Sequence, residues 1–320
     1  MNVYRIGLIG LGIIGQRMLA NTPHHPGFQA ICAWDPDPRA MQVTGEQYPG
    51  LRLVDSADAV IHDAGIDLVY IACPPQFHAA YAAAAADNGK AVLCEKPLGI
   101  DLADSRSLVR RIEERQSVNA VNFVFGSAPA SQQLAGHLKA GDAGRVLHVD
   151  LRLHFTRWPR DWQAAADWLR FREQGGFTRE VTSHFVYLAE RLFGPARLTH
   201  VARGWQADPK LCESHLMAVL DFDGLPMSIT SSAGGAGEDV VEFTVRGSER
   251  SYRLWNWFLL QSSEGADWQN QMDPSQDLRT AAVQAQLDNL HRQLSGERHS
   301  MPSFADALRV QELIEAMLAS

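Results

Sequence analysis

The sequence has little positive charge, few cysteines and no long hydrophobic run. Lys and Arg number 29 against 37 Asp and Glu, which gives a net charge of −8 with the cations scattered along the chain. Without a basic face, neither nucleic acid nor an anionic membrane is an expected partner. The apolar run at residues 79–86 is short, contains Tyr81 and ends at Asp87. It therefore predicts a packed helix rather than a membrane span.

The four cysteines have no metal-ligand spacing, so no metal site is predicted. Three of them lie in or at the end of apolar runs, which predicts buried free thiols in the reducing cytoplasm. The first apolar strand begins almost at Met1, and we therefore expect no signal or transit peptide. At 320 residues, the chain has the length of two domains. The cysteines are Cys32, Cys73, Cys94 and Cys212.

A glycine-rich turn, GLGIIG at residues 10–15, stands between an apolar run and a helical pattern. Gly10 permits a tight turn, Gly12 lets the backbone approach a pyrophosphate, and Gly15 lets the helix pack closely on the strand. The pyrophosphate would rest on N–H groups at the helix N-terminus. The pattern predicts a bound nicotinamide or flavin dinucleotide, and the alternative is a glycine-rich turn without a ligand.

Asp35 closes the next apolar run and bears on the choice of cofactor. A carboxylate there accepts hydrogen bonds from the adenosine 2′- and 3′-hydroxyls and would repel a 2′-phosphate. NAD is therefore favoured, while Arg39 lies close enough in the sequence to leave NADP as the alternative.

Up to about residue 123, short apolar runs alternate with helical patterns, which predicts a doubly wound parallel sheet covered on both faces. Ser56 and Asp101 are predicted helix N-caps, and Gly89 is a predicted C-cap. The apolar runs lie at residues 28–34, 51–54, 68–72, 91–94 and 118–121, and the helical patterns at residues 39–48, 77–88 and 102–116.

After about residue 125 strands predominate, and the run 146–155 alternates apolar and polar residues as a strand with one wet face does. A second α/β domain with a large open, mostly antiparallel sheet is predicted, with Asp223 and Gly224 forming a hairpin turn. Its exposed face is the expected interface of a homo-oligomer, a dimer or a tetramer. Further strands are predicted at residues 198–204, 215–222, 226–231, 240–246 and 252–258, and helices at 130–140, 278–294 and 303–318, the last packing back on the first domain.

Lys96 follows directly on the apolar run 91–94, between Glu95 and Pro97. In an open α/β sheet, ligands bind outside the carboxyl ends of the strands. A lysine at that edge is placed to exchange a proton with a substrate hydroxyl. The alternative is a solvated lysine in a surface loop.

These motifs together resemble the Gfo/Idh/MocA oxidoreductases. The resemblance includes the glycine turn, Asp35, residues 71–78 and Glu95-Lys96-Pro97, and it continues at residues 141–146, 167–170, 175–176, 192–194 and 302–308. It implies a Rossmann domain at residues 1–123, then an α/β substrate and oligomerisation domain at residues 124–320. It also implies NAD(P)-linked chemistry on small molecules, namely sugars, polyols or related hydroxy compounds.

The resemblance assigns Lys96 the role of the catalytic lysine, in contact with the cofactor and the reacting hydroxyl. It places Asn122 near the nicotinamide ribose, and Pro74 and His78 along the adenosine and nicotinamide side. The Lys96–Pro97 bond is often cis in relatives. The implied cofactor residues are Gly10, Gly12, Ile13, Ile14, Gly15, Asp35, Arg39, Cys73, Pro74, His78, Glu95 and Asn122.

His184 matches a second-domain histidine that relatives use as acid or base, or to hold the substrate. On a helix, Glu180 and His184 stand at i and i+4, which predicts a carboxylate–imidazole pair that addresses the substrate. The alternative is a first-turn glutamate near the helix dipole and a core-facing histidine. The implied catalytic residues are Lys96, His184 and Glu180, and the implied substrate residues are Lys96, Trp168, Arg170, Glu180, His184 and Tyr187.

The second domain departs from the family pattern. Relatives usually read Asp-x-Gly-x-His, where this chain has Glu180 and Thr182 before His184, and Tyr187 stands where an aspartate is common. The substrate is therefore expected to differ from the commonest sugar polyols. A cluster of tryptophans and arginines either lines a pocket or only packs a loop. It comprises Trp158, Trp162, Trp168, Arg157, Arg160 and Arg170, while Trp255 and Trp257 fit sheet-face packing on the strand predicted at 252–258.

The leading interpretation is an NAD(H)-dependent oxidoreductase that moves a hydride between nicotinamide and a secondary hydroxyl or carbonyl. One alternative is a glycoside hydrolase that uses tightly held NAD. Another is a non-enzymatic regulator that senses NAD or a sugar. Intact Glu95-Lys96-Pro97 and His184 argue against the regulator, which needs no proton-transfer lysine.

Overall fold

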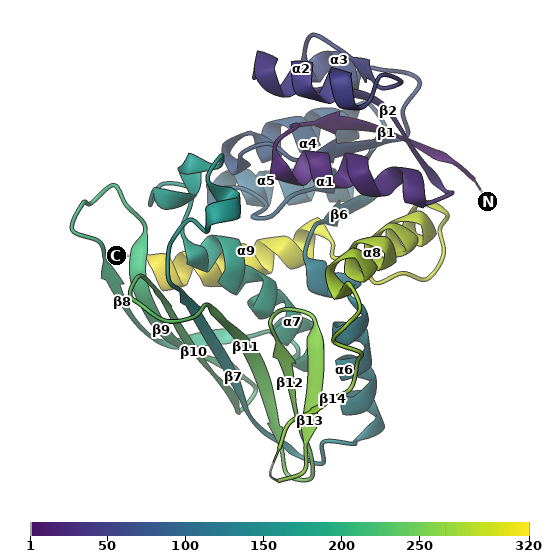
Figure 1. Cartoon of the computed structure of the whole chain (residues 1–320). Helices are drawn as coiled ribbons and strands as arrows, with labels where there is room; N and C mark the ends of the chain where they lie inside the picture. The colour runs from purple at the N-terminus through teal and green to yellow at the C-terminus, as the bar shows by residue number, and fades with distance from the viewer. Residues whose placement is uncertain (1, 266, 320) are drawn as a thin grey trace. The chain divides into compact units, whose positions relative to one another are not determined.

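The computed structural model describes residues 2–265 and 267–319, which form two compact units (Figure 1). One unit runs up to Phe123 and includes Gln286–Arg309, and the other comprises Val124–Ala285 and the chain from Val310 onward. The domain predicted at 124–320 differs from this division, because residues 286–309 group with the first unit. The physical reason is apolar burial, since Leu287, Leu290 and Met301 lie in the core of that unit.

The first unit is built on a six-stranded sheet in the order β3-β2-β1-β4-β5-β6, in which all neighbouring strands are parallel. The predicted doubly wound parallel sheet is thus confirmed. Its strands are β1 (Tyr4–Ile9), β2 (Phe28–Trp34), β3 (Arg52–Leu53), β4 (Leu68–Ile71), β5 (Ala91–Cys94) and β6 (Asn119–Val121).

The helices of this unit begin where their caps predict. Ser56 Oγ accepts from Ala59 N at 3.0 Å, and Asp101 Oδ1 accepts from Asp104 N at 2.9 Å, so both predicted N-caps are confirmed. Gly89, at φ +69°, follows the last turn of α4. The helices are α1 (Ile13–Asn21), α2 (Pro38–Gln47), α3 (Ala57–Ile61), α4 (His78–Asp87) and α5 (Leu102–Glu114).

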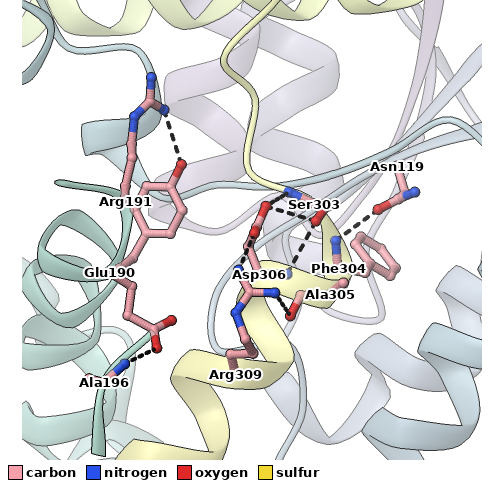
Figure 2. A network of polar contacts seen from close by, with 10 residues as sticks. Asn119, Glu190, Arg191, Ala196, Ser303, Phe304, Ala305, Asp306 and Arg309 are labelled. Carbon is pink, nitrogen blue, oxygen red and sulfur yellow. Dashed lines mark hydrogen bonds and ion pairs between the residues drawn. The ribbon is translucent and has the colours of Figure 1, made fainter. Parts of the chain in front are cut away.

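Two C-terminal helices, α8 (Leu278–Leu294) and α9 (Phe304–Leu318), fall where the periodicity predicts. The start of α9 belongs to the first unit, where Asp306 Oδ2 accepts from Ser303 Oγ at 2.7 Å and Asn119 Oδ1 accepts from Phe304 N at 2.8 Å (Figure 2). The later turns of α9 belong to the second unit. There Glu315 makes a two-bond ion pair with Arg179 at 2.6 and 2.8 Å. The second half of α8 and the first residues of α9 thus belong to the first unit, and the packing expected of the last helix stays a prediction.

The second unit contains an eight-stranded sheet in the order β14-β13-β12-β11-β7-β10-β9-β8. Among the strand pairs of the described residues in this sheet, only β7–β10 is parallel, so the predicted mostly antiparallel sheet is confirmed. The strands are β7 (Val146–Phe155), β8 (Arg197–Trp205), β9 (Glu213–Phe222), β10 (Leu225–Ala233), β11 (Val240–Gly247), β12 (Ser251–Trp255), β13 (Leu259–Ser263) and β14 (Gln269–Asn270).

Two turns with positive φ connect neighbouring strands of this sheet. Asp223 (φ +52°) and Gly224 (φ +90°) join β9 to β10, as predicted. Asn256 (φ +50°) and Trp257 (φ +77°) join β12 to β13. The strand predicted at 252–258 is therefore wrong beyond Trp255, because two successive left-handed residues end the extended backbone.

In the second unit, helices α6 (Pro129–Ala140) and α7 (Ser183–Phe193) lie against one face of the sheet (Figure 1). Gly141 ends α6 in the left-handed conformation at φ +82°. A short π-helix, Thr178–Thr182, leads directly into α7. Among the helices of the described residues, none is long and apolar enough to cross a membrane.

Candidate functional site

The glycine turn between β1 and α1 uses its glycines for different reasons. Gly10 has φ +103°, and a Cβ built there would lie 2.6 Å from the carbonyl carbon of Ala72. A Cβ on Gly15 would lie 2.1 Å from the carbonyl oxygen of Gly10. The fold itself therefore requires both glycines. Gly12 is different, because a Cβ there would meet no atom within 4 Å.

The open space over Gly12 fits the pyrophosphate of a dinucleotide. Gly12 is the N-cap of α1 and has no side chain to accept from the first N–H groups, those of Ile13 and Ile14 among them. Helix N-termini of this kind bind anions, because the N–H groups and the helix dipole both favour negative charge. The residues present therefore fit the predicted cofactor.

Asp35 lies just after β2, beside the glycine turn. Its Oδ2 accepts from Leu11 N at 2.7 Å, and its Oδ1 accepts from Asp37 N at 2.8 Å. These bonds fix the carboxylate at the end of the strand, where an adenosine ribose would meet it. Arg39 is exposed in the first turn of α2, and its backbone N–H donates to Asp37 Oδ1 at 2.9 Å.

Glu95 is the centre of a buried network at the carboxyl edge of the parallel sheet. Its side chain is only 8% exposed, and Oε1 accepts from Tyr70 OH at 2.5 Å and also from Asn122 Nδ2. Asn122 Oδ1 accepts from Gln286 Nε2 of α8 at 2.5 Å. Burial, and next the charge of Glu95, hold the pKa of Tyr70 well above its usual value, so Tyr70 remains a donor. Sequence reasoning missed Tyr70 and Gln286, because neither carries a local motif.

Lys96 is half-buried in the loop after β5, and its peptide bond to Pro97 is cis. His78, at the start of α4, is fully buried, with Nδ1 2.8 Å from the Pro97 carbonyl oxygen and Nε2 2.8 Å from that of Cys73. The ring therefore joins the loop after β4 to the loop that carries Lys96. Burial lowers the pKa of His78, and the charge of Lys96 acts in the same direction.

Cys73 and Pro74 form the loop between β4 and α4. Cys73 is half-buried, and burial raises the pKa of its thiol to about 12. The other three cysteines are buried, and all four are free thiols. Pro74 has φ −60° and precedes a short 3₁₀ helix, Pro75–Phe77. A thiol with a raised pKa is a poor nucleophile at neutral pH, so nothing in the loop points to thiol chemistry at Cys73.

Glu180 and His184 lie in the second unit, but not on one continuous α-helix as the spacing suggested. Glu180 belongs to the π-helix, and His184, 5% exposed, belongs to the first turn of α7. Short π-helical segments inside helices occur frequently at functional sites. The i and i+4 geometry is therefore corrected to a π-to-α junction.

A buried carboxylate, that of Glu213, accepts a hydrogen bond from the backbone at the start of the π-helix. The sequence itself does not single out this residue. Glu213 is 1% exposed, and its Oε1 accepts from Thr178 N at 2.7 Å. Burial raises the pKa of Glu213. Gly176 has φ +99°, and a Cβ there would lie 2.4 Å from Glu213 Oε2. The close approach of this carboxylate thus explains Gly176, whereas Gly175 is explained by the backbone, because a Cβ there would lie 2.4 Å from the Leu169 carbonyl oxygen.

Glu180 is fixed by Gln163, which is 2% exposed. Gln163 Nε2 donates to Glu180 Oε1 at 3.0 Å, and Gln163 Oε1 accepts from Arg160 Nε at 2.9 Å. The guanidinium of Arg160 lies within 5.9 Å of four ring centroids. These rings belong to Phe155, Trp158, Trp162 and Trp257.

Trp257 joins this cluster to His184, with ring centroids 5.6 Å apart in an edge-on arrangement. Sequence reasoning placed Trp257 on a sheet face. Trp257 instead lies in the hairpin turn between β12 and β13, where its ring contacts His184 and Arg160.

The remaining predicted substrate residues lie at other places in the second unit. Trp168 is half-buried in the short 3₁₀ helix Asp167–Arg170, and Arg170 pairs with Asp167 at 3.3 Å. Tyr187 is 6% exposed, and its hydroxyl accepts from Arg191 at 3.2 Å. The second unit thus holds Glu180, His184, Trp168, Arg170 and Tyr187, and the first unit holds the glycine turn, Asp35 and Lys96.

Comparison with protein families decides the assignment. The NAD-binding Rossmann fold of the Gfo/Idh/MocA oxidoreductase family matches residues 4–123, and the C-terminal alpha/beta domain of that family matches residues 136–320. The chain belongs to the Gfo/Idh/MocA family. The resemblance inferred from the motifs, the NAD-binding domain and the two-part fold are thereby confirmed.

Individual relatives within the family differ in what they act on. The chain is 29% identical over 201 residues to scyllo-inositol 2-dehydrogenase (NAD+) of Bacillus subtilis, a match that covers 62% of this chain and 56% of that protein. It is 28% identical to the dTDP-3,4-didehydro-2,6-dideoxy-α-D-glucose 3-reductase of Streptomyces violaceoruber, over 98% of this chain and 94% of that protein.

A solved structure has the same fold over nearly the whole chain. It is an oxidoreductase from Agrobacterium radiobacter in complex with NAD+, L-tartaric acid and magnesium. The TM-score is 0.83 at 22% identity, covering 98% of this chain and 94% of that one. At this identity the likeness shows the fold alone.

Proposed function

We propose that this chain is an NAD-dependent dehydrogenase or reductase. Its substrate would be a sugar, a polyol or a related small compound with a secondary hydroxyl or carbonyl. The observation that carries the proposal is Lys96, half-buried after β5 at the same carboxyl edge as Asp35 and the glycine turn. The activities named for the Bacillus and Streptomyces relatives support this substrate class.

The first unit would bind and orient the cofactor. N–H groups at the start of α1 would hold the pyrophosphate, with Gly12 leaving room for it, and Asp35 would accept from the adenosine hydroxyls. NAD, when bound, supplies the hydride acceptor or donor. Lys96 Nζ would take the proton from the substrate hydroxyl during oxidation and return it during reduction.

The second unit would contribute His184 and Glu180 to the same reaction. His184 would hold the substrate hydroxyl or share its proton, and the Glu180 carboxylate, fixed by Gln163, would orient the substrate. The rings around Arg160 would provide an apolar surface for a sugar ring.

We also infer a cytoplasmic homo-oligomer. Four free thiols are typical of a reducing compartment. In the second unit, the face of the sheet that carries Arg152 and Met217 is open, with Met217 58% exposed. Light scattering on the purified protein tests this point, and a monomer at micromolar concentration would contradict it.

The catalytic assignment is tested by Lys96→Met. NADH formation is followed by absorbance against a panel of sugars, polyols, inositols and hydroxy acids. We expect the variant to lose most turnover, by about a hundredfold or more, while it still binds NADH. Lys139→Met, at an exposed position of α6, is the matched control. Near-normal turnover of Lys96→Met would refute the role of Lys96.

A further inference from the structure

We propose that Tyr70 and His78 are positioning residues that hold Lys96 from its two sides. Tyr70 acts through the side chain of Glu95, the residue before Lys96, and His78 acts through the carbonyl of Pro97, the residue after it. The inference rests on the proposed function, because it explains how the proton-transfer lysine is kept in place. All the residues involved belong to the first unit.

The Tyr70 side of this support is a bond to a buried carboxylate. Tyr70 is 1% exposed, Glu95 is 8% exposed, and the hydroxyl lies 2.5 Å from Oε1. Hydrogen bonds to an ionised acceptor are stronger than neutral ones. Removing one donor leaves a buried charge less well satisfied, which is costly. The side chain of Glu95 is thereby held in one orientation, and the backbone that leads into Lys96 is held with it.

A second donor and a residue distant in sequence complete this side. Asn122 donates to the same oxygen of Glu95, and its own carbonyl accepts from Gln286, which is 7% exposed. The order of donors fixes the Asn122 amide, with its nitrogen toward Glu95 and its oxygen toward Gln286. Asn122 thus takes part in orienting Glu95, alongside the cofactor role that the resemblance implies.

The His78 side is a ring between two backbone carbonyls. Nδ1 lies 2.8 Å from the oxygen of Pro97, and Nε2 lies 2.8 Å from that of Cys73. A neutral imidazole carries one N–H and donates to one carbonyl at a time, whereas the imidazolium donates to both. In either state the buried ring sets the spacing between the loop after β4 and the Lys96 loop.

The Tyr70–Glu95 and His78–Pro97 interactions hold the two neighbours of Lys96, which points to a role in proton transfer. Proton transfer requires the base within about 3 Å of the proton it takes. A displacement of about 1 Å can cost two orders of magnitude in rate. A flexible lysine side chain gains precision when the backbone on both sides of it is held.

The test compares Tyr70→Phe and His78→Asn with two matched controls. Tyr81→Phe removes a hydroxyl from a half-buried tyrosine of α4, and His62→Asn alters an exposed histidine. For both test variants we expect kcat to fall about tenfold, a loss of roughly 1.4 kcal/mol in transition-state stabilisation, with KM changed less than about twofold. The controls should stay within about twofold of the parent protein in both constants.

A second readout follows Lys96 itself and needs no substrate. The rate of Lys96 acetylation by acetic anhydride is measured against pH by mass spectrometry, with exposed Lys139 and Lys210 as internal standards. We expect the pH profile of Lys96 to shift in both test variants, while Lys139 and Lys210 keep theirs. A purely structural role would lower the melting temperature without moving this profile.

A double-mutant cycle isolates the Tyr70 side. If Tyr70 acts through Glu95, Tyr70→Phe should have little further effect on kcat in a Glu95→Gln background. If His78→Asn does not fold, His78→Gln is the second variant, because its longer amide still reaches one carbonyl. Additive effects in the cycle would contradict the proposed path.

The outcomes separate this inference from the proposed function. Suppose that the Lys96 acetylation profile shifts in Tyr70→Phe and His78→Asn, while Lys96→Met keeps full turnover. This result would support the positioning of Lys96 and refute its catalytic role. Loss of turnover in Lys96→Met, with unchanged kcat and an unchanged Lys96 profile in Tyr70→Phe and His78→Asn, would overturn the positioning alone.

Discussion

The glycine turn of the first unit and the π-to-α junction of the second unit each carry residues implicated in function, but they are built differently. The glycine turn is local, since Gly10, Gly12, Gly15 and Asp35 lie within one β-α-β segment. The junction depends on distant residues, because Gln163, Glu213 and Trp257 fix or flank Glu180 and His184. A site built from residues close in sequence can be recognised as a motif, whereas a site built from distant residues has no such motif.

The strongest test of the local site compares two glycines. Gly15→Ala places a Cβ 2.1 Å from the Gly10 carbonyl oxygen, so we expect the largest effect here, a loss of about 3 kcal/mol or more of folding free energy. Gly12→Ala meets no such protein atom, so its loss should be smaller, about 1 kcal/mol or less, because alanine is a poorer N-cap than glycine.

The two variants should separate in cofactor binding as well. Gly12→Ala is expected to weaken NADH binding at least about tenfold, because the methyl group occupies the space of the pyrophosphate. Urea denaturation and NADH fluorescence titration measure the two effects. A Gly12→Ala protein with unchanged NADH affinity would mean that the cofactor does not approach this backbone.

The corresponding test of the assembled site is Gly176→Ala. The residue has φ +99°, and the new Cβ would lie 2.4 Å from Glu213 Oε2. Backbone strain alone costs about 1–3 kcal/mol, so we expect a loss of roughly 2 kcal/mol or more in urea denaturation. Gly136→Ala, inside α6 and without a close neighbour, is the control and should be neutral or stabilising. Equal stability of Gly176→Ala and Gly136→Ala would contradict the conclusion that the close approach of Glu213 requires a glycine at position 176.

Gln163→Leu probes the distant support of Glu180 at smaller cost. The change removes the donor to Glu180 Oε1, and a hydrogen bond to a charged group contributes about 1.5–3 kcal/mol. We expect lower kcat/KM by about tenfold and unchanged NADH affinity. Gln132→Leu, whose amide bonds only to the Gly126 carbonyl among the hydrogen bonds described, serves as the control. Equal kinetics in the two variants would remove Gln163 from the site.

The smallest expected effect is on the pH dependence of stability. His78 has a pKa lowered from 6.5 in the folded protein, so the unfolded chain binds more protons just below that value. The neutral His78 ring therefore contributes fully to folding stability above about pH 6.5. This stability is lost as the pH falls through and below that value. Between about pH 7.5 and about pH 5.5, the parent protein should lose more melting temperature than His78→Asn. Parallel pH curves would show that His78 is not the titrating group.

Prediction from the sequence succeeded where the signal was short-range. Strand β7 and helix α8 fall at the predicted residues, because each shows one clear period over ten or more positions. Ser56 and Asp101 cap the helices that their position before the helical pattern indicates. The family resemblance, confirmed by both domain matches, rests on the same kind of local motif.

Prediction failed where a contact between distant residues decided the backbone. The strand predicted at 252–258 ends at Trp255, because Asn256 and Trp257 take the left-handed conformation. Asn favours this conformation but Trp does not, so the residue types gave only a partial signal for the turn. Residues 286–309 join the first unit because their apolar side chains find its core. The roles of the catalytic and substrate residues remain proposals, which the variants above test.

The sequence by itself determined the parallel sheet, the glycine turn with Asp35, the position of Lys96 after a buried strand, and the family. Each of these follows from residue types at close spacing, where steric fit and hydrophobic periodicity act within a few turns of chain. Only the tertiary structure decided that Tyr70 and His78 hold the neighbours of Lys96, and that Gln163, Glu213 and Trp257 surround the π-to-α junction. These contacts join residues far apart in sequence, and buried polar groups choose their partners only after the strands and helices have packed.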